Sequence, residues 1–230
     1  MKKSNKLLLS GFLTVVLLIA TIHIAVYAKY KNGKFTIYHR EDRLADIMQP
    51  FPNVSHVTIR NVYGAIIVFS DRAEVEKDKN KIQYVQKGDS LVITGLDRNS
   101  QLNGGHVINI ILPFNVTLSA FNSLLYFEKG KKTADNNPVI YLQKTHALFL
   151  DKNNPLLLQH VKLVASDSST AAFHGNIQVN DLEVQLSNSA LEYNEGDAGT
   201  LSIVTDSVSR ISLLSKHLLK AKITTIPVNP

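Results

Sequence analysis

The chain has 230 residues, no cysteine and a formal net charge of +6, so disulfide bonds, thiolate catalysis, Cys-ligated zinc and a cysteine-linked lipid anchor are excluded. The first 43 residues hold eight Lys or Arg against two Asp or Glu, and the remainder holds 17 of each sign. A nucleic-acid-binding domain concentrates its cations on the binding domain, so we expect no nucleic-acid partner and expect the N-terminal excess to meet anionic lipid instead.

Residues 7–28 form an uncharged apolar segment when His23 is taken as neutral. A helix crosses a bilayer core with about 20 residues, so we predict a transmembrane helix over 7–28 after a cytoplasmic tail at 1–6. A cleavable signal peptide is the alternative, although its apolar run is usually about 7–15 residues. The lysines before the segment favour an inside N-terminus, which makes this a single-pass protein with its bulk outside the cytoplasm and the bilayer as its partner through residues 7–28.

Residues 29–53 are predicted to be a juxtamembrane connector, and residues 54–230 a β-domain. Within the connector, Phe35–Tyr38 indicates a short strand and Arg43–Met48 a helical turn that Pro50 ends. From Val54 onward the pattern is that of strands and turns. The expected elements are an alternating strand at 54–59, an apolar strand at 65–69, a hairpin of 82–86 and 91–95 that turns at Gly88–Asp89, a turn at 103–105, and a strand at 107–112 that ends at Pro113.

From Val116 a pair of short apolar strands recurs along the chain. The steps between the first strands are 23, 22, 21, 19 and 20 residues, and those between the second strands are 23, 23, 20 and 20. Two series with similar steps indicate a solenoid, in which each coil covers the apolar face of its neighbour. The first strands are 116–118, 139–141, 161–163, 182–184, 201–203 and 221–223, and the second strands are 125–127, 148–150, 171–173, 191–193 and 211–213.

Small polar residues, rich in Ser, Asn and Asp, join the two strands of each coil. Such residues close tight bends by bonding their own backbone, so stacked coils are expected to align them into ladders. The longer segments Lys129–Pro138 and Asp151–Pro155 are expected to bulge from the other corner. The polar corners are 119–123, 144–146, 166–170, 187–189 and 206–209.

The first strands alternate between apolar and polar residues, as in Leu182, Glu183 and Val184. Successive side chains of a strand point to opposite faces, so Leu182 and Val184 are predicted inside and Glu183 in water. Val184 then stacks between Leu163 and Ile203 of the flanking coils. The sequence thus predicts an all-β parallel solenoid preceded by one transmembrane helix.

Paired short strands with Ser, Asn or Asp corners, preceded by the phrase Lys87-Gly88-Asp89-Ser90-Leu91-Val92-Ile93, resemble bacterial autotransporter-adhesin proteins of the "head GIN domain" type. The lysine-rich N-terminus and single apolar segment are similar to an uncharacterised anchored group related to that family. The resemblance covers roughly residues 54–225 and includes no catalytic motif. It implies a single-stranded, right-handed parallel β-helix at the cell envelope with an adhesin-like role.

No residue pattern indicates a catalytic, cofactor-binding or metal site. The sequence lacks a Gly-rich phosphate loop and a nucleophile elbow, and its histidines are too far apart for a metal-ligand pair, which favours isolated surface histidines. These histidines are His56, His106, His146, His160, His174 and His217. Four aspartates raise the idea of a glycosidase carboxylate pair, but turn closure at the corners explains them. They are Asp167, Asp181, Asp197 and Asp206.

Aromatic residues recur at strand positions of the solenoid. They indicate either a sugar-stacking strip or core stacking, and core stacking is favoured because half of each strand points inward. The residues are Tyr126, Phe127, Tyr141, Phe149, Phe173 and Tyr193.

The sequence therefore predicts a membrane-anchored extracytoplasmic β-solenoid that is not an enzyme and acts as a structural or interaction module for a protein or glycan partner. A carbohydrate-active β-helix enzyme of the cell envelope is the alternative, and it requires carboxylates from neighbouring coils to converge in one exposed groove. A third hypothesis is an accessory protein that contacts its partner through the unpaired end of the solenoid.

Overall fold

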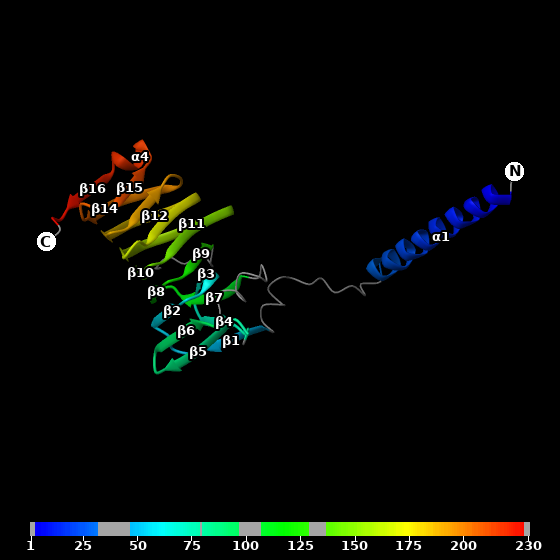
Figure 1. Ribbon diagram of the computed structural model, residues 1–230, viewed down its shortest axis with the longest axis horizontal. Coiled ribbons are helices and arrows are strands. Elements are labelled where there is room, and N and C mark those ends of the chain that lie inside the picture. The colour runs from blue at the N-terminus through cyan, green and yellow to red at the C-terminus, as the bar shows by residue number, and fades with distance from the viewer. Residues whose placement is uncertain (1–2, 32–46, 79, 97–106, 129–136, 228–230) are drawn as a thin grey trace. The chain divides into compact units, whose positions relative to one another are not determined.

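The computed structural model of the chain describes residues 3–31, 47–78, 80–96, 107–128 and 137–227 (Figure 1). The chain divides into two compact units, Met1–Asp46 and Ile47–Pro230. Several sequence predictions lie outside the described residues. These are the strand at 35–38, most of the helical turn at 43–48, the turn at 103–105 and most of the excursion at 129–138.

The described residues of the first unit form the helix α1 (Lys3–Lys31). Its stretch Leu9–Lys29 is long and apolar enough to cross a membrane, and none of that stretch is buried. This confirms a continuous apolar helix over the predicted segment. A signal sequence near an N-terminus has the same length and composition.

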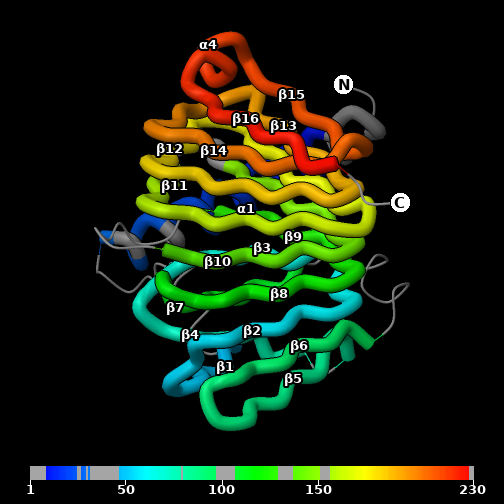
Figure 2. The backbone as a smooth tube through the Cα atoms, turned by 90° about the vertical axis from the view of Figure 1, so that its left-hand side faces the viewer, coloured from blue at the N-terminus to red at the C-terminus, as the bar shows by residue number. Residues whose placement is uncertain are grey.

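The second unit is a β-solenoid whose rungs lie on two faces, and Figure 2 shows the rungs stacked from β5 at the bottom to β16 at the top. Face A consists, in stacking order, of β5 (Ile82–Lys87), β6 (Ser90–Gly95), β2 (His56–Arg60), β8 (Thr117–Phe121), β10 (Val139–Gln143), the second halves of β11 (His146–Ser166) and β12 (Thr170–Ser187), β14 (Asp197–Thr205) and β16 (Ala221–Thr225). Face B consists of β1 (Met48–Phe51), β4 (Ala73–Glu76), β7 (Ile108–Pro113), β3 (Tyr63–Ser70), β9 (Leu124–Glu128), the first halves of β11 and β12, β13 (Ala190–Tyr193) and β15 (Arg210–Leu213). The predicted parallel β-solenoid is thus confirmed, and its right-handed winding stays a prediction.

The order of the stack differs from the order of the chain at the N-terminal end. Strand β2 lies between β6 and β8, and β3 lies between β7 and β9. The first coil of the sequence, which contains β2 and β3, is therefore covered by β6 and β7, which come later in the sequence. The predicted hairpin is present as the antiparallel pair β5 and β6. Residues 48–51, which the sequence placed in the connector, form β1 and pair with β4.

Inward columns of apolar side chains form the core. Val184 pairs with Leu163 in the rung below and with Ile203 in the rung above. Leu182 and Val184 are each 1% exposed, whereas Glu183 is exposed. The inside and outside assignments made from the sequence are confirmed for this strand.

The register predicted for the second coil is wrong by one residue. Ile140, rather than Val139 or Tyr141, stacks on Leu118, and Phe149 stacks on Phe127. Residues 139–142 and 147–150 contain almost only apolar side chains, so no alternation distinguishes the two faces of these strands. The expected bulge at 151–155 corresponds to a register irregularity in β11 between Asp151 and Leu156.

A column of aromatic rings runs through the core along face B, and its neighbouring pairs are stacked except for Phe173 and Tyr193, whose planes are tilted by 58°. Each stacked aromatic pair contributes about 0.5–1.5 kcal/mol beyond the burial of its area. The members from bottom to top are Phe69, Phe127, Phe149, Phe173, Tyr193 and His217, with neighbouring ring centroids 4.3–5.9 Å apart.

Buried hydroxyl groups form a ladder at the polar corner, as predicted. The backbone N–H of Val62 donates to Ser123 Oγ (3.2 Å), that of Ser123 to Thr145 Oγ1 (3.3 Å), and that of Thr145 to Ser169 Oγ (3.2 Å). Each hydroxyl thereby satisfies an N–H that the bend removes from the strand ladder. This ladder fixes the vertical alignment of successive coils.

We expect Val184→Asp to destabilise the protein by several kcal/mol, because an unpaired carboxylate would enter the column between Leu163 and Ile203. The total stability of a domain is about 5–15 kcal/mol, so most of it would be lost. Glu183→Lys, one residue away and exposed, is the matched control and should change stability by less than about 0.5 kcal/mol. Urea unfolding midpoints measure both variants, and equal midpoints would contradict the assigned register.

Candidate functional site

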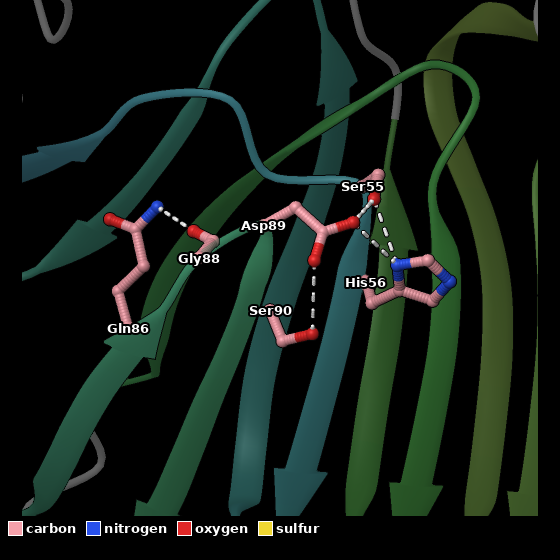
Figure 3. A network of polar contacts seen from close by, with 6 residues as sticks. All are labelled: Ser55, His56, Gln86, Gly88, Asp89 and Ser90. Atoms are coloured by element: carbon pink, nitrogen blue, oxygen red, sulfur yellow. Dashed lines mark hydrogen bonds and ion pairs between the residues drawn. The ribbon is translucent and has the colours of Figure 1, made fainter.

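A polar network lies at the N-terminal end of face A, where the β5–β6 turn meets the start of β2 (Figure 3). Ser55 Oγ donates a hydrogen bond to Asp89 Oδ2. His56 Nδ1 lies 2.8 Å from Ser55 Oγ and 3.1 Å from Asp89 Oδ2. The residue types are those of a Ser-His-Asp hydrolase, so the geometry decides whether the network is a catalytic site.

The geometry is that of a structural staple. A hydrolytic triad places the serine and the carboxylate on opposite nitrogens of the imidazole, whereas here both lie at Nδ1 and the serine proton points to the carboxylate. The backbone N–H groups of Ser55 and His56 also donate to the Asp89 carbonyl, at 3.0 and 3.2 Å. The hydrogen bond from Ser55 and the contact with His56 lower the pKa of Asp89. The network therefore joins β2 to the β5–β6 turn.

Each of the four aspartates considered for glycoside hydrolysis has its own hydrogen-bond or ion-pair partner. Asp167 accepts from Gln143, and Asp181 accepts from Thr200 Oγ1 at 2.6 Å. Asp197 forms an ion pair with Lys220, and Asp206 accepts from backbone N–H groups of its own corner. Three shallow hollows follow the outer surface of face A, and Asp206 is the one carboxylate among the residues that line them. Within the described residues no group of three His, Asp or Glu is placed to hold a metal ion.

The aromatic residues divide between core and surface. Phe127, Phe149, Phe173 and Tyr193 are buried in the ring column, which confirms core stacking for these four. The two other tyrosines point outward from different strands, Tyr126 from β9 on face B and Tyr141 from β10 on face A. They lie on different faces and form no common strip.

The histidines do not all lie isolated at the surface. His56 belongs to the polar network, and His160 lies 3.9 Å from Glu183. His217 is fully buried, so its assignment to the surface is wrong; it ends the ring column at 4.3 Å from Tyr193. Sequence reasoning missed this role because a lone histidine among leucines and lysines carries no spacing motif. His106 lies outside the described residues.

Helix α4 (Ser215–Leu218) closes the ring column at the C-terminal end, where Figure 2 shows it above the last rungs. Lys216 Nζ donates to the Gly196 carbonyl, and Lys220 Nζ lies 3.1 Å from both Asp197 Oδ1 and the Ala198 carbonyl. These lysines fasten the helix to the turn between β13 and β14. The hydrogen bond from Lys220 lowers the pKa of Asp197.

The buried end of the column holds polar atoms without partners. Within the described part of the chain, the two ring nitrogens of His217 and the hydroxyl of Tyr193 have no hydrogen-bond partner. Burial lowers the pKa of His217, Lys216 and Lys220 lower it further, and Asp197 opposes them. Burial also raises the pKa of Tyr193, with Asp197 adding to the effect.

The segment that forms this closure is rich in exposed apolar residues and in lysine. We call residues 214–226 the C-terminal cap. Of the ten exposed large hydrophobic residues that the structure describes within 47–227, five lie in the cap: Leu214, Leu218, Leu219, Ile223 and Ile226. The last 24 residues hold four Lys or Arg and no Asp or Glu, whereas residues 44–206 hold 13 Lys or Arg and 17 Asp or Glu. The neutral average of the β-domain thus concealed a basic C-terminal segment, in which Lys220 pairs with Asp197.

The N-terminal end of the stack is closed differently. Phe51 of β1 and Tyr84 of β5 meet edge to face, with ring centroids 5.2 Å apart, so the two faces join beneath the core. Pro50 lies in the edge strand β1, a position where proline blocks further strand pairing. The C-terminal cap is therefore the candidate contact surface of the molecule.

Comparisons with known proteins identify no family for the chain. No protein-family model matches it, and no curated sequence matches it significantly. A crystal structure of a "putative cell adhesion protein" from Clostridium sporogenes matches with 10% identity and a TM-score of 0.22, covering 78% of this chain and 96% of that one. A likeness of this size carries no argument about function, and membership in the head GIN domain family stays a prediction.

The buried His217 predicts a pH dependence of stability. The unfolded histidine titrates near its ordinary pKa of 6.5, whereas the folded one stays neutral to lower pH, so the unfolded state binds the extra proton. The contribution of His217 to stability is therefore fully present above about pH 6.5 and is lost as the pH falls below that value. We expect the urea midpoint to drop between about pH 7.5 and about pH 5, and His217→Phe, which keeps a ring in the column, to remove this drop.

The exposed His146 provides the control, since His146→Phe should leave the drop in place. An equally steep loss in the wild type and in His217→Phe would show that the cap histidine does not titrate with unfolding.

Proposed function

We propose that the protein is a single-pass, membrane-anchored interaction module, with its β-solenoid outside the cytoplasm and the C-terminal cap as its contact surface for a protein, glycan or lipid partner. Helix α1 supports the anchor, because Leu9–Lys29 has the length and composition of a membrane span. The lysines at positions 2, 3 and 6 support an inside N-terminus.

One observation carries this function: the C-terminal cap is unlike the cap that a soluble solenoid requires. Terminal repeats of solenoids present a polar outer face, since an apolar one aggregates. Here Leu219 is 89% and Leu218 58% exposed, and Ile223, the last member of the Leu163–Val184–Ile203 column, is 41% exposed. A surface of this kind is typical of an interaction site.

The edge of β16 by itself is a weaker candidate. This strand pairs with β14 on one side, and no other described strand pairs with its second side, where strand addition could occur. However, Lys222 within the strand and Pro227 shortly after it are the residues by which proteins prevent edge pairing. The leucines of α4 and its following turn therefore carry the proposal rather than the strand edge.

The absence of cysteine allows a direct test in the full chain. A photo-crosslinker attached to Leu219→Cys, activated in native membranes, should form adducts that remain with the protein when the membranes are then washed with alkaline carbonate. The same reagent on Glu183→Cys, an exposed position in the middle of face A, should form none. Equal labelling at the two positions would contradict the contact surface, and a soluble product that begins near Lys29 would contradict the anchor.

A further inference from the structure

We infer that the C-terminal cap binds the headgroup surface of an anionic lipid bilayer. This inference rests on the proposed function, because it names the partner of the same surface. The chemical class follows from three features of the cap: its leucines, its lysines and their mutual placement.

The leucines of the cap are exposed to solvent and do not pack into the core of the solenoid. His217, the inward residue of α4, completes the ring column, whereas its neighbour Leu218 points to solvent. Leu219 in the following turn is the most exposed large hydrophobic side chain among residues 47–227 that the structure describes. Single exposed leucines are common, but adjacent ones at the end of a stack form a patch that a partner or a lipid phase would cover.

Three lysines lie next to these leucines in the sequence, at positions 216, 220 and 222. Lys216 and Lys220 are fixed beside Leu218 and Leu219 by their bonds to the β13–β14 turn, and the Lys220 side chain is still 45% exposed. Lys222 lies two residues further on and has no ion-pair partner within the described residues. Lysine stems lie along apolar surface while their ammonium groups stay in a polar phase.

This combination fits a bilayer interface better than a nucleic acid or an acidic polypeptide. A nucleic acid would take the lysines, but it offers no apolar phase for Leu218 and Leu219. An acidic strand that paired with the edge of β16 would lie near Lys222. It would leave Leu218 and Leu219 uncovered, because both residues precede β16. At a bilayer interface, aliphatic side chains enter the boundary of the acyl chains while cations meet anionic headgroups.

The full chain, reconstituted into vesicles, tests this inference. An environment-sensitive fluorophore on Ser215→Cys, at an exposed position of α4, reports on the cap without altering its leucines. The vesicles contain phosphatidylcholine with or without phosphatidylglycerol, and bromine on the acyl chains quenches a fluorophore that reaches the interface. We expect quenching at position 215 in the anionic vesicles, and none for the same label on Glu183→Cys.

Two matched variants separate the contributions of charge and apolar surface. Each cation near an anionic membrane contributes about 1 kcal/mol, so Lys222→Gln should lower the ratio of docked to undocked caps about fivefold. The double variant Leu218→Asn with Leu219→Asn should abolish quenching while leaving the urea midpoint unchanged, because both side chains are exposed.

Three results would overturn the inference in different ways. Equal quenching in zwitterionic vesicles would remove the requirement for anionic lipid. Labels at 215 and 183 that behave alike, together with protein adducts at Leu219→Cys, would replace lipid by a protein partner and preserve the proposed function. Labels that behave alike without any such adducts would overturn both proposals.

Discussion

The structure depends on one constraint, the fixed spacing of about 4.8 Å between hydrogen-bonded strands. Coils that repeat at this spacing place equivalent residues directly above one another, so every inward position becomes a column. A column tolerates one kind of side chain along its length, as Leu163, Val184 and Ile203 illustrate. The same spacing suits stacked rings, whose centroids between Phe127 and Phe173 are 4.3–4.4 Å apart.

A stack of this kind has two ends, and they require separate solutions. The N-terminal end turns back on itself through antiparallel strands, and the rings of Phe51 and Tyr84 meet beneath the core. The C-terminal end is instead closed by one buried imidazole, that of His217. Lys216 and Lys220 hold its helix in place by bonding to the β13–β14 turn. The neighbouring Leu218 and Leu219 remain exposed to solvent. The sides of the stack carry separate, locally satisfied polar groups, so the end offers the more distinctive chemistry.

The alternation and the period of the sequence predicted the solenoid, the polar ladder and the inward positions around Val184. They failed where alternation disappears: residues 139–142 and 147–150 contain almost only apolar side chains, so either register buried enough surface. The placement of β2 between β6 and β8 could not be predicted, because the repeat becomes regular only after residue 116 and the pairing is not between neighbours in the sequence. The candidate site was concealed for a related reason, since averaging the charge over the whole β-domain cancelled a basic end against an acidic remainder.

The stacking order of the coils determines which end of the solenoid is closed and which is free. Spin labels on outward residues of one column measure it directly, with Gln185 of β12 as the common reference. At about 4.8 Å per strand, we predict separations from Gln185 of about 14 Å for Ser119, about 19 Å for Thr58 and about 24 Å for Val92. A larger separation for Thr58 than for Val92 would mean that the coils stack in the order of the chain, and would contradict the closed N-terminal end.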